Sequence, residues 1–361
     1  MQASPLVTVG MPVFNGERYL LAAVNSILSE RFSDWELVAV DDGSTDRSLS
    51  ILLGIDDPRV RVIVNSTNLG LVACRNRILD EARGIYIAWL DQDDLTYPYR
   101  LEYQVKLLER SPHVGICGGW SDLLIQDTDD SQYILREKQP GSHAEIRAQM
   151  LFSNPLKCNT VMMRKSALVD HGLVFRTEFG NALDYDLWSR ASDQMVVHNI
   201  GAGLGAYRIH ASQTSHGREL EQINESALEV QRQLMLRSLG IHMNHWQESV
   251  HRRLTLPPVA LNTPSELLET AEWLAHLRHT NGRVHAFSER PLDAVLTRQW
   301  VTALAGAQRG GVSLRLLPSL ARQGLEIIGL PRTAFLGSVV TGIMRGVKRS
   351  RVSHSARSLR T

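Results

Sequence analysis

Residues 36–53 read ELVAVDDGSTDRSLSILL, and this stretch indicates how the chain folds. It begins with an apolar run typical of a buried strand, continues through a polar loop and ends in a helical pattern. The alternation repeats on both sides, with strands expected at 6–14, 36–40, 60–65 and 85–90, and helices at 18–28, 44–53 and 71–82. Thr45 or Asp46 is the expected N-cap of the second helix. Such alternation predicts an α/β fold with a mostly parallel sheet and helices on both faces.

Polar loops follow each of the four expected strands. They read PVFNGE (12–17), DDGSTD (41–46), NSTNLG (65–70) and DQDD (91–94). In parallel sheets of this kind, ligands bind beyond the carboxyl ends of the strands. We therefore expect these loops to converge on one edge of the sheet and to form the functional site there.

The DQDD loop places Asp91, Asp93 and Asp94 directly after the apolar run IAWL. Burying carboxylates this close together costs several kcal/mol each unless positive charge compensates, so a cation is the natural partner. A solvated turn is the simplest alternative. A calcium loop fits poorly, because Leu95 and Thr96 stand where a ligand and a glycine are needed, and a phosphatase nucleophile would follow the first strand instead. A Mg²⁺ or Mn²⁺ site completed by substrate phosphates remains.

Several classes of protein are disfavoured by composition and motifs. The 361 residues carry a net charge of only +1, which argues against a general nucleic-acid binder. The first strand lacks a following G-x-G-x-x-G, which disfavours a dinucleotide-binding dehydrogenase. The three cysteines, far apart and odd in number, fit a reducing cytoplasm. We see neither a secretion leader nor an apolar run long enough for a membrane span, so a cytoplasmic protein is expected.

After residue 111 the pattern becomes less regular. Helices are expected at 143–152, 165–172 and 184–192, and extended segments at 159–164, 195–200 and 204–210. Beyond residue 217 the strand signals vanish, and helices are expected at 219–239, 264–279 and 292–308. We therefore divide the chain into residues 1–110, residues 111–216 and a C-terminal helical extension over 217–361.

Four segments taken together resemble the family 2 glycosyltransferases. They read VTVGMPVFNGERYL, LVAVDDGSTDRS, NLGLVACRNRILDEARGIYIAWLDQDD and NALDYDLWSR, and the resemblance covers roughly residues 6–215. It implies a GT-A-type, Rossmann-like fold in which residues 1–110 bind a nucleotide-sugar donor and residues 111–216 bind the acceptor. The implied reaction is transfer of a sugar, with inversion, from a nucleoside diphosphate to the hydroxyl of a saccharide or lipid-linked acceptor in bacterial surface polysaccharide or glycolipid assembly.

The resemblance also implies roles for individual residues. Those implied for the nucleoside are Pro12, Phe14, Asn15, Glu17 and Asp41. The carboxylate of Asp41 is suited to accept hydrogen bonds from a nucleobase N–H or from ribose hydroxyls. In CRN, Arg75 corresponds to an arginine that helps to hold the nucleotide, although a surface ion pair is the simpler interpretation of that residue alone. The D-x-D motif implies Asp91 toward the ribose and Asp93 on the metal, while Asp94 is expected to hydrogen-bond locally.

The catalytic base implied by the resemblance is Asp184. The family usually has E-D-Y-D-L-W where this chain has LDYDLW, so Leu183 replaces the glutamate. Whatever the glutamate does for the acceptor in the family, Leu183 does not provide it. Asp186 is the rival candidate, and on a helix it lies about 200° around the axis from Asp184. The alternative for Asp184 is a charge at a helix N-terminus that interacts with the macrodipole.

The segment YRIHASQTS resembles the part that closes the site in bacterial members of the family. His210 would then complete the metal shell, and Arg208 would face the diphosphate. A lone histidine after a strand is more often a surface residue, so this expectation depends on the neighbouring motif.

The C-terminal residues 331–361 contain seven Arg or Lys and no Asp or Glu. Within 334–351, apolar residues at helical spacing precede a basic cluster. One interpretation is an amphipathic helix on the inner, anionic face of the membrane. The other is a helix packed on the main domain with a disordered basic tail. A homodimer formed through this helix is a further open alternative.

The leading hypothesis is thus a metal-dependent, inverting glycosyltransferase. A nucleotide-sugar-binding scaffold without turnover is an alternative, because Leu183 departs from the family pattern. A nucleotidyltransferase is a third hypothesis, but the sequence has no glycine-rich loop with a basic residue to support it.

Overall fold

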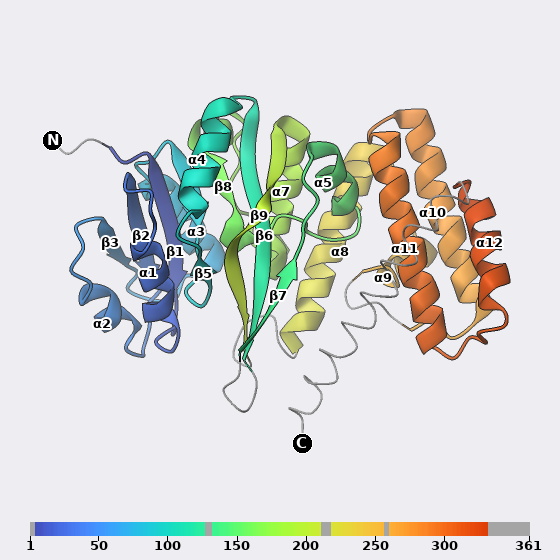
Figure 1. Cartoon of the computed structure of the whole chain (residues 1–361), viewed down its shortest axis with the longest axis horizontal. Helices are drawn as coiled ribbons and strands as arrows, with labels where there is room; N and C mark the ends of the chain where they lie inside the picture. The colour runs from blue at the N-terminus through green and yellow to red at the C-terminus, as the bar shows by residue number, and fades with distance from the viewer. Residues whose placement is uncertain (1–3, 127–131, 211–217, 256–259, 331–361) are drawn as a thin grey trace, which may run out of the picture. The chain divides into compact units, whose positions relative to one another are not determined.

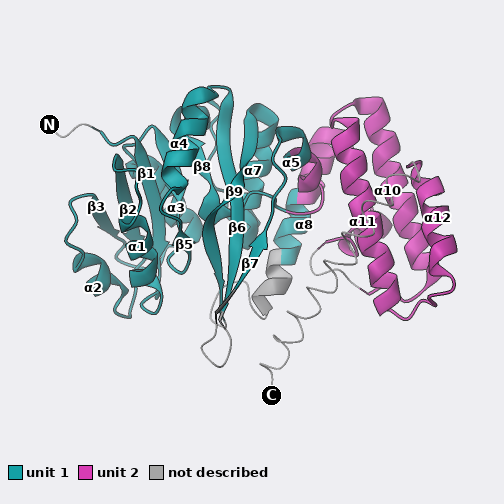
Figure 2. Cartoon of the chain, viewed as in Figure 1, with its two compact units in different colours: residues 1–146, 154–230 teal, residues 147–153, 231–361 magenta. Residues whose placement is uncertain are grey.

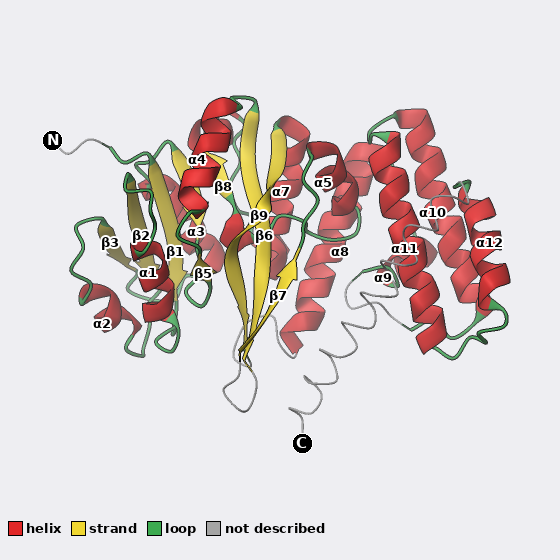
Figure 3. Cartoon of the chain, in the orientation of Figure 1, coloured by secondary structure: helices red, strands yellow, loops and turns green. Residues whose placement is uncertain are grey.

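A computed structural model describes residues 4–126, 132–210, 218–255 and 260–330. The chain forms two compact units, one of residues 1–146 and 154–230 and the other of residues 147–153 and 231–361 (Figure 2). The first unit contains the sheet and its flanking helices, and the described part of the second unit is helical (Figure 3). The predicted α/β fold with a C-terminal helical region is confirmed.

In the described part of the first unit, nine strands form one sheet (Figure 1). They are β1 (Val7–Val13), β2 (Trp35–Asp41), β3 (Val60–Val64), β4 (Tyr86–Trp89), β5 (Leu95–Thr96), β6 (Val114–Gln126), β7 (Gln132–Glu137), β8 (Met162–Arg164) and β9 (Val196–Ile209). Their order is β3-β2-β1-β4-β8-β6-β9-β5, with β7 paired to β6. The four N-terminal strands are parallel to one another, while β8, β7 and β5 pair antiparallel to their neighbours.

The first half of the sheet is covered by helices on both faces. These are α1 (Leu20–Leu28), α2 (Ser48–Leu53), α3 (Leu71–Glu81) and α4 (Arg100–Arg110). Alternate residues of β1 join the core cluster that contains Leu20, Val24 and Ile27 of α1. On the other face, Gly10 lets α3 approach closely, since a Cβ there would lie 2.5 Å from Cγ2 of Ile78. The backbone of β1 is thereby buried on both sides, as expected for a central parallel strand.

Strand order places a topological switch point between β1 and β4. From β1 the chain adds β2 and β3 on one side, and then crosses to place β4 on the other. The loops after β1 and β4 therefore leave the sheet in opposite directions, which opens a crevice between them. Sheets of this type bind ligands in such a crevice. The predicted site segment at 12–17 begins with the last two residues of β1 and continues into the loop after it, and the segment at 91–94 follows β4.

The long strand β6 and the continuity of β9 are not evident from the sequence. Gly118 and Gly119 interrupt the apolar pattern of β6, but the packing requires them. A Cβ on Gly118 would lie 2.4 Å from Oδ1 of Asn199, and one on Gly119 would lie 2.5 Å from Cδ1 of Leu204. Both partners belong to β9, which runs unbroken through the two separate segments expected at 195–200 and 204–210.

The remaining elements of the first unit lie between and around these strands. They are α6 (Lys165–Asp170), α7 (Leu183–Gln194) and two short 3₁₀ segments, η1 (Cys158–Thr160) and η2 (Thr177–Ala182). Two more helices, α5 (His143–Met150) and α8 (Arg218–Leu239), begin in the first unit and end in the second. The expected N-cap of α2 is wrong: the cap is Arg47, and Asp46 instead accepts the N–H groups of Glu17 and Ser48.

The second unit is built around helices α9 (His245–Arg252), α10 (Pro264–Val284), α11 (Glu289–Arg309) and α12 (Leu317–Ile328). A buried polar chain crosses its core. Trp273 Nε1 donates to His251 Nδ1 at 3.1 Å, and the other His251 nitrogen bonds Gln231 Oε1 at 3.1 Å. Gln231 in turn donates to the carbonyl of Phe152. Because both ring nitrogens are used, the imidazole stays neutral, and burial lowers the pKa of His251 to about 3.

None of the helices formed by the described residues has the length and apolar character needed to cross a membrane. The predicted basic helix at 334–351 lies outside the described residues. The predicted functional division at residue 110 lies within the first unit and stays a prediction, while the unit boundary after residue 230 falls inside α8.

Candidate functional site

The loops that follow β1 and β4 are joined directly across the switch point. The side-chain amide of Gln92 accepts the N–H of Phe14 at 2.9 Å and donates to its carbonyl at 3.1 Å. This pair of bonds continues the β1–β4 pairing beyond the end of the regular ladder, which stops at Gly10 and Trp89. The nucleoside loop predicted after β1 is therefore held against the D-Q-D-D segment.

A second set of bonds ties the β1 loop to the loop after β2. Asn15, in the left-handed backbone region with a φ of 48°, accepts the N–H of Thr45 at 2.8 Å. Glu17 accepts the backbone N–H and the Nε of Arg47 at 3.0 and 3.1 Å. Asn15 and Glu17, which were predicted to bind the nucleoside, therefore hold the two loops together. Phe14, beside them, is 42% exposed.

Two adjacent carboxylates at the end of β2 have different surroundings. Both oxygens of Asp42 are used by the chain, accepting the N–H groups of Leu69 and Gly70 and the Asn65 amide. Asp41 is 1% exposed, yet its Oδ1 has no hydrogen-bond partner among the described residues. Buried polar atoms are normally paired, so the free oxygen of Asp41 is suited to a ligand's N–H or O–H. Pro12 precedes Val13, the β1 register partner of Asp41, and lies beyond the last β4 partner, where a missing N–H disrupts no β1–β4 ladder bond.

The three D-Q-D-D carboxylates have three different partners. Asp91 Oδ1 accepts from Arg75 Nη2 at 3.1 Å, and Asp93 Oδ2 lies 2.9 Å from His210 Nε2. Asp94 is 1% exposed and accepts the backbone N–H of Arg208 at 2.9 Å. The antiparallel pairing of β5 with β9 makes these last contacts, because it brings the end of β9 alongside the loop.

The carboxylates of the D-Q-D-D segment are buried close together and repel one another. Burial raises the pKa of Asp93, and the charge of Asp91 adds to this effect, while His210 opposes it. Burial raises the pKa of Asp94 still further, with contributions from Asp93 and Asp91. A cation near Asp93 would relieve both effects.

Arg75 is at the centre of the site and is only 4% exposed, so the surface ion-pair interpretation of this residue is wrong. Its guanidinium carbon lies 5.5 and 5.4 Å from the ring centroids of Trp89 and Phe175. Burial alone would lower the pKa of Arg75, but the nearby acidic groups Cys158, Asp91 and Asp184 raise it. A fixed positive charge therefore lies between the D-x-D loop and the start of α7.

The pair formed by Asp93 and His210 fits a divalent cation completed by other ligands. Two ligands at right angles, each 2.0–2.1 Å from an octahedral ion, lie about 3 Å apart. The two side-chain atoms lie 2.9 Å apart, which is a hydrogen-bond distance; they could keep this spacing as ligands if a cation replaced the proton that they share. Within the described residues, no three His, Cys, Asp or Glu side chains group around a common ion position. The remaining ligands would be donor phosphates and water, which is the usual arrangement for Mg²⁺ with nucleotides.

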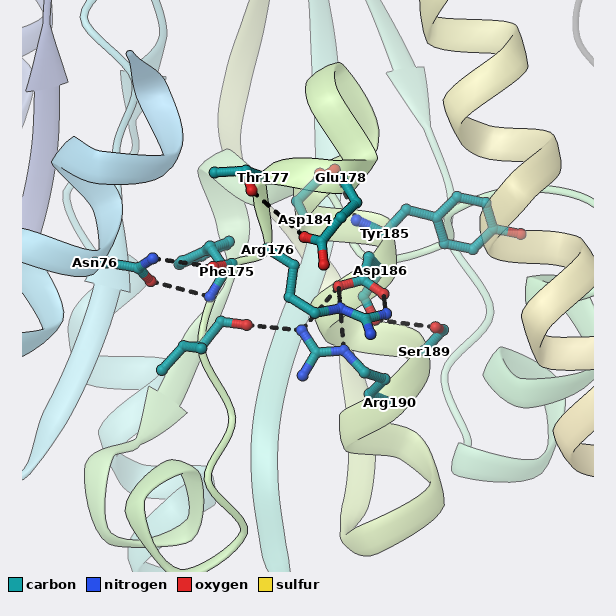
Figure 4. A network of polar contacts seen from close by, with 11 residues as sticks. Asn76, Phe175, Arg176, Thr177, Glu178, Asp184, Tyr185, Asp186, Ser189 and Arg190 are labelled. Carbon is teal, nitrogen blue, oxygen red and sulfur yellow. Dashed lines mark hydrogen bonds and ion pairs between the residues drawn. The ribbon is translucent and has the colours of Figure 1, made fainter. Parts of the chain in front are cut away.

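The start of α7 separates the two base candidates clearly (Figure 4). Asp186 is 1% exposed and is clamped by two arginines: it accepts from Nε of Arg176 at 3.0 Å and from Nε and Nη2 of Arg190 at 3.1 and 2.8 Å. Asp184 instead bonds the Asn154 amide at 3.1 Å, and its own helix supplies the N–H of Tyr185 at 2.7 Å. Both oxygens of Asp186 are therefore used by arginines, whereas Asp184 interacts electrostatically with Arg75.

Electrostatics distinguish Asp184 as well. Burial raises the pKa of its carboxyl, and Asp91 adds to this, while Arg75, the Tyr185 N–H and Lys157 oppose the increase. Leu183, which stands where the family has a glutamate, is 2% exposed and belongs to the core.

Five predicted residues are thus linked near the switch point. They come from α3, from α7 and from the segments after β4 and β9: Arg75, Asp184, Asp91, Asp93 and His210. Arg208 lies beside them, donating from Nε to the Asp93 carbonyl and stacking on the ring of Tyr19 at 4.7 Å. Residues that the sequence did not single out are Tyr19, Gln92 and Asn154. Gln92 lies inside the quoted motif, but Asn154 has no pattern around it.

Comparisons with known proteins agree with this geometry. The model of the family described as "Glycosyl transferase family 2" matches residues 8–172. A glycosyltransferase of Haemophilus influenzae is 34% identical over 240 residues, which cover 64% of this chain and 74% of the relative. The Escherichia coli enzyme WfgD, named a UDP-Glc:alpha-D-GlcNAc-diphosphoundecaprenol beta-1,3-glucosyltransferase, is 26% identical over 58% of this chain and 79% of its own length.

A solved structure shares the fold at low identity. Staphylococcus aureus TarS 1-349 in complex with UDP-GlcNAc superposes with a TM-score of 0.51 at 18% identity, covering 88% of this chain and 92% of that one. The GT-A-type fold predicted from the sequence is therefore confirmed. Taken with the family match and the Haemophilus relative, these findings show that the chain belongs to glycosyl transferase family 2.

Proposed function

We propose that this family 2 glycosyltransferase is an inverting, metal-dependent enzyme that transfers a sugar from a nucleoside diphosphate to an acceptor hydroxyl. The observation that carries the proposal is the position of Arg75, which pairs with Asp91 of the D-x-D loop and interacts electrostatically with Asp184. The expected donor-binding loop and the proposed base thus both interact with one buried arginine, Arg75. This single site is suited to join a donor and an acceptor.

In the proposed reaction Asp184 takes the proton of the acceptor hydroxyl as its oxygen attacks the anomeric carbon opposite the leaving diphosphate. A base works best when its pKa approaches the working pH, and burial moves the pKa of Asp184 upward in that direction. Its hydrogen bonds from Asn154 and Tyr185 limit the rotation of the carboxylate. Asp186 has no part in the reaction because its oxygens are used by Arg176 and Arg190.

The leaving diphosphate lies, in this proposal, between the D-x-D loop and the end of β9. Asp93 and His210 would hold Mn²⁺ or Mg²⁺, which would offset the charge that develops on the leaving group. Arg208 supplies a fixed positive charge on the same side, because its Nε is anchored on the Asp93 carbonyl. Arg75 pairs with Asp91 and orients its carboxylate toward the ribose.

The nucleoside occupies the crevice between the β1 and β2 loops. Asp41 accepts a base N–H or ribose hydroxyl through its unpaired Oδ1. Phe14 offers an exposed ring, and Pro12, Asn15 and Glu17 set the loop's shape. Because Gln92 holds this loop to the D-Q-D-D segment, nucleoside binding and metal binding should be coupled.

The acceptor class follows from the relatives. WfgD's name specifies a lipid-linked saccharide acceptor, and the TarS complex contains UDP-GlcNAc. We propose a saccharide or lipid-linked acceptor in polysaccharide assembly at the cytoplasmic face of the membrane. Contact with that surface through residues 334–351, and a homodimer, stay proposals.

The test is calorimetric binding of UDP, GDP, dTDP and CDP, each with and without Mn²⁺, to the wild type and Asp93→Ala. We expect one nucleotide to bind tightly only with Mn²⁺, and the variant to lose this metal dependence. Binding that is unaffected by Mn²⁺ would remove Asp93 and His210 from the metal site. Absence of binding by all four nucleotides would contradict the donor site as a whole.

A further inference from the structure

Among the described residues, the carboxylate of Asp184 receives one hydrogen bond from outside its own helix. Nδ2 of Asn154 donates to Oδ2 of Asp184 at 3.1 Å, although the two residues are 30 positions apart in the chain. The other oxygen, Oδ1, accepts the N–H of the adjacent residue Tyr185. Because Tyr185 offers its N–H whatever the side chains nearby, Asn154 is the side chain that distinguishes one rotation of the carboxylate from another.

The orientation of the Asn154 amide is itself fixed. Its Oδ1 accepts the N–H of Leu156 at 3.1 Å, which forms a tight turn around Pro155. Since the amide oxygen is used in this turn, the NH₂ group is the end that faces Asp184. The turn is anchored from the other side by Asn199, 2% exposed, which donates to the carbonyl of Pro155 at 3.1 Å.

We propose that Asn154 is a positioning residue for the base: it fixes the rotation of the Asp184 carboxylate and stabilises its ionised form. The inference rests on the proposed function, in which Asp184 accepts the acceptor's proton. Asn154 acts through Asp184 and need not touch either substrate.

The charges around Asp184 determine the direction of the expected effect. Arg75 on α3 and Lys157 before η1 favour its ionised form, while Asp91 opposes it, and Cys158 also lies close by. A hydrogen-bond donor such as the Asn154 amide stabilises the anion. Its removal should therefore raise the pKa of Asp184, so that the base becomes protonated, and activity is lost, at a higher pH than in the wild type.

The first test is the pH dependence of nucleoside diphosphate release from UDP-glucose or UDP-GlcNAc, whichever the wild type hydrolyses faster with water as the acceptor. For Asn154→Ala we expect a rate about tenfold lower and an acid limb shifted upward by about one pH unit. Asn154→Asp keeps the turn oxygen but replaces the donor with a like charge, so its limb should move further, by about two units. KM for the donor should stay within about twofold in both variants, because neither contacts it in this proposal.

A matched control comes from Asn281 in the second unit. It also braces a turn through both ends of its amide, bonding the N–H and carbonyl of Phe287 at 2.8 and 2.9 Å. Asn281→Ala should lower thermal stability without moving the acid limb. If Asn154→Ala behaves in the same way, its role is structural only and the inference is wrong.

A second test requires no turnover. Asn154→Asp should lower the melting temperature at pH 8, where both carboxylates are charged, more than at pH 4, where at least one is protonated. In an Asp184→Asn background this difference between the two pH values should disappear. If it persists, the two side chains do not interact in solution.

The two proposals fail in distinguishable ways. Turnover that survives in Asp184→Asn would overturn the proposed base and the role of Asn154 with it. Loss of turnover in Asp184→Asn, together with an unmoved acid limb in both Asn154 variants, would overturn the positioning role alone.

Discussion

Two isosteric substitutions at the start of α7 should have opposite consequences. Asp184→Asn and Asp186→Asn each replace one carboxylate by an amide of the same shape, two residues apart on the same helix. We expect the first to lose most of its turnover while the protein stays stable, and the second to destabilise a protein whose remaining folded fraction still turns over. The difference follows from what each carboxylate bonds: Asp184 accepts from Asn154, whereas Asp186 accepts from the two arginines drawn in Figure 4.

The size of the Asp186 effect can be worked from its surroundings. Its two oxygens accept charge-assisted bonds from Arg176 and Arg190, and its side chain is 2% exposed. Breaking a buried ion pair costs about 3–5 kcal/mol. The side chains of Arg176 and Arg190 are 31% and 16% exposed, so water recovers part of this. We expect a loss of about 2–4 kcal/mol, or roughly 4–16 °C in melting temperature for a unit of this size.

For Asp184→Asn the stability change should be small, because burial already disfavours the charged form. The amide keeps the carboxylate's shape but accepts no proton, so turnover should fall by about 10²–10⁴-fold. Nucleotide binding should persist, since the D-x-D loop is unchanged.

The assay combines melting curves with initial rates of nucleoside diphosphate release, both scaled to the folded fraction. The reasoning is refuted if Asp186→Asn melts like the wild type while losing turnover, because that would make Asp186 the base. It is also refuted if Asp184→Asn retains more than about a tenth of the wild-type rate, which the general-base assignment does not allow.

Three further predictions concern other parts of the molecule. Gln92→Ala removes both bonds to Phe14, so nucleotide affinity measured by calorimetry should fall about tenfold while kcat at saturation changes little; unchanged affinity would contradict the bracing role. His251 stays neutral when folded, so its folded-state pKa is depressed; the stability it contributes is complete above pH 6.5 and is lost as the pH falls toward 3. In urea unfolding, the wild type should lose about 2 kcal/mol of stability at pH 5 through this effect, and His251→Gln should not. Equal pH dependence of stability in both proteins would argue against a neutral, buried His251. Gly119→Ala places a Cβ 2.5 Å from Leu204, and denaturant unfolding should show a cost of about 1–3 kcal/mol; a neutral result would mean that β6 and β9 can separate.

The sequence by itself determined the N-terminal half of the sheet and the place of the site. Strands β1, β2, β3 and β4 are short apolar runs followed by polar loops, so local periodicity is enough to identify them. Their parallel arrangement sends every loop to the same edge, which is why Asp41, Asp91 and Asp93 could be grouped before any contact was known. The family motifs added Arg75 and Asp184 because these residues lie within short, ordered patterns.

Only the tertiary structure decided which of two neighbouring carboxylates is used in hydrogen bonds within the protein and which has an oxygen left for a ligand or a reaction. Asp41 and Asp42 are adjacent, yet the N–H groups that occupy Asp42 come from Leu69 and Gly70, across β3. Asp184 and Asp186 are two residues apart, and they differ because Arg176 binds only the second.

The same reason explains what periodicity missed. Strand β6 contains glycines because β9 packs against it, and Asn154 reaches Asp184 from 30 positions away. A hydrogen bond or a close contact between distant segments leaves no periodic trace in the sequence, since the chain must fold before the partners meet.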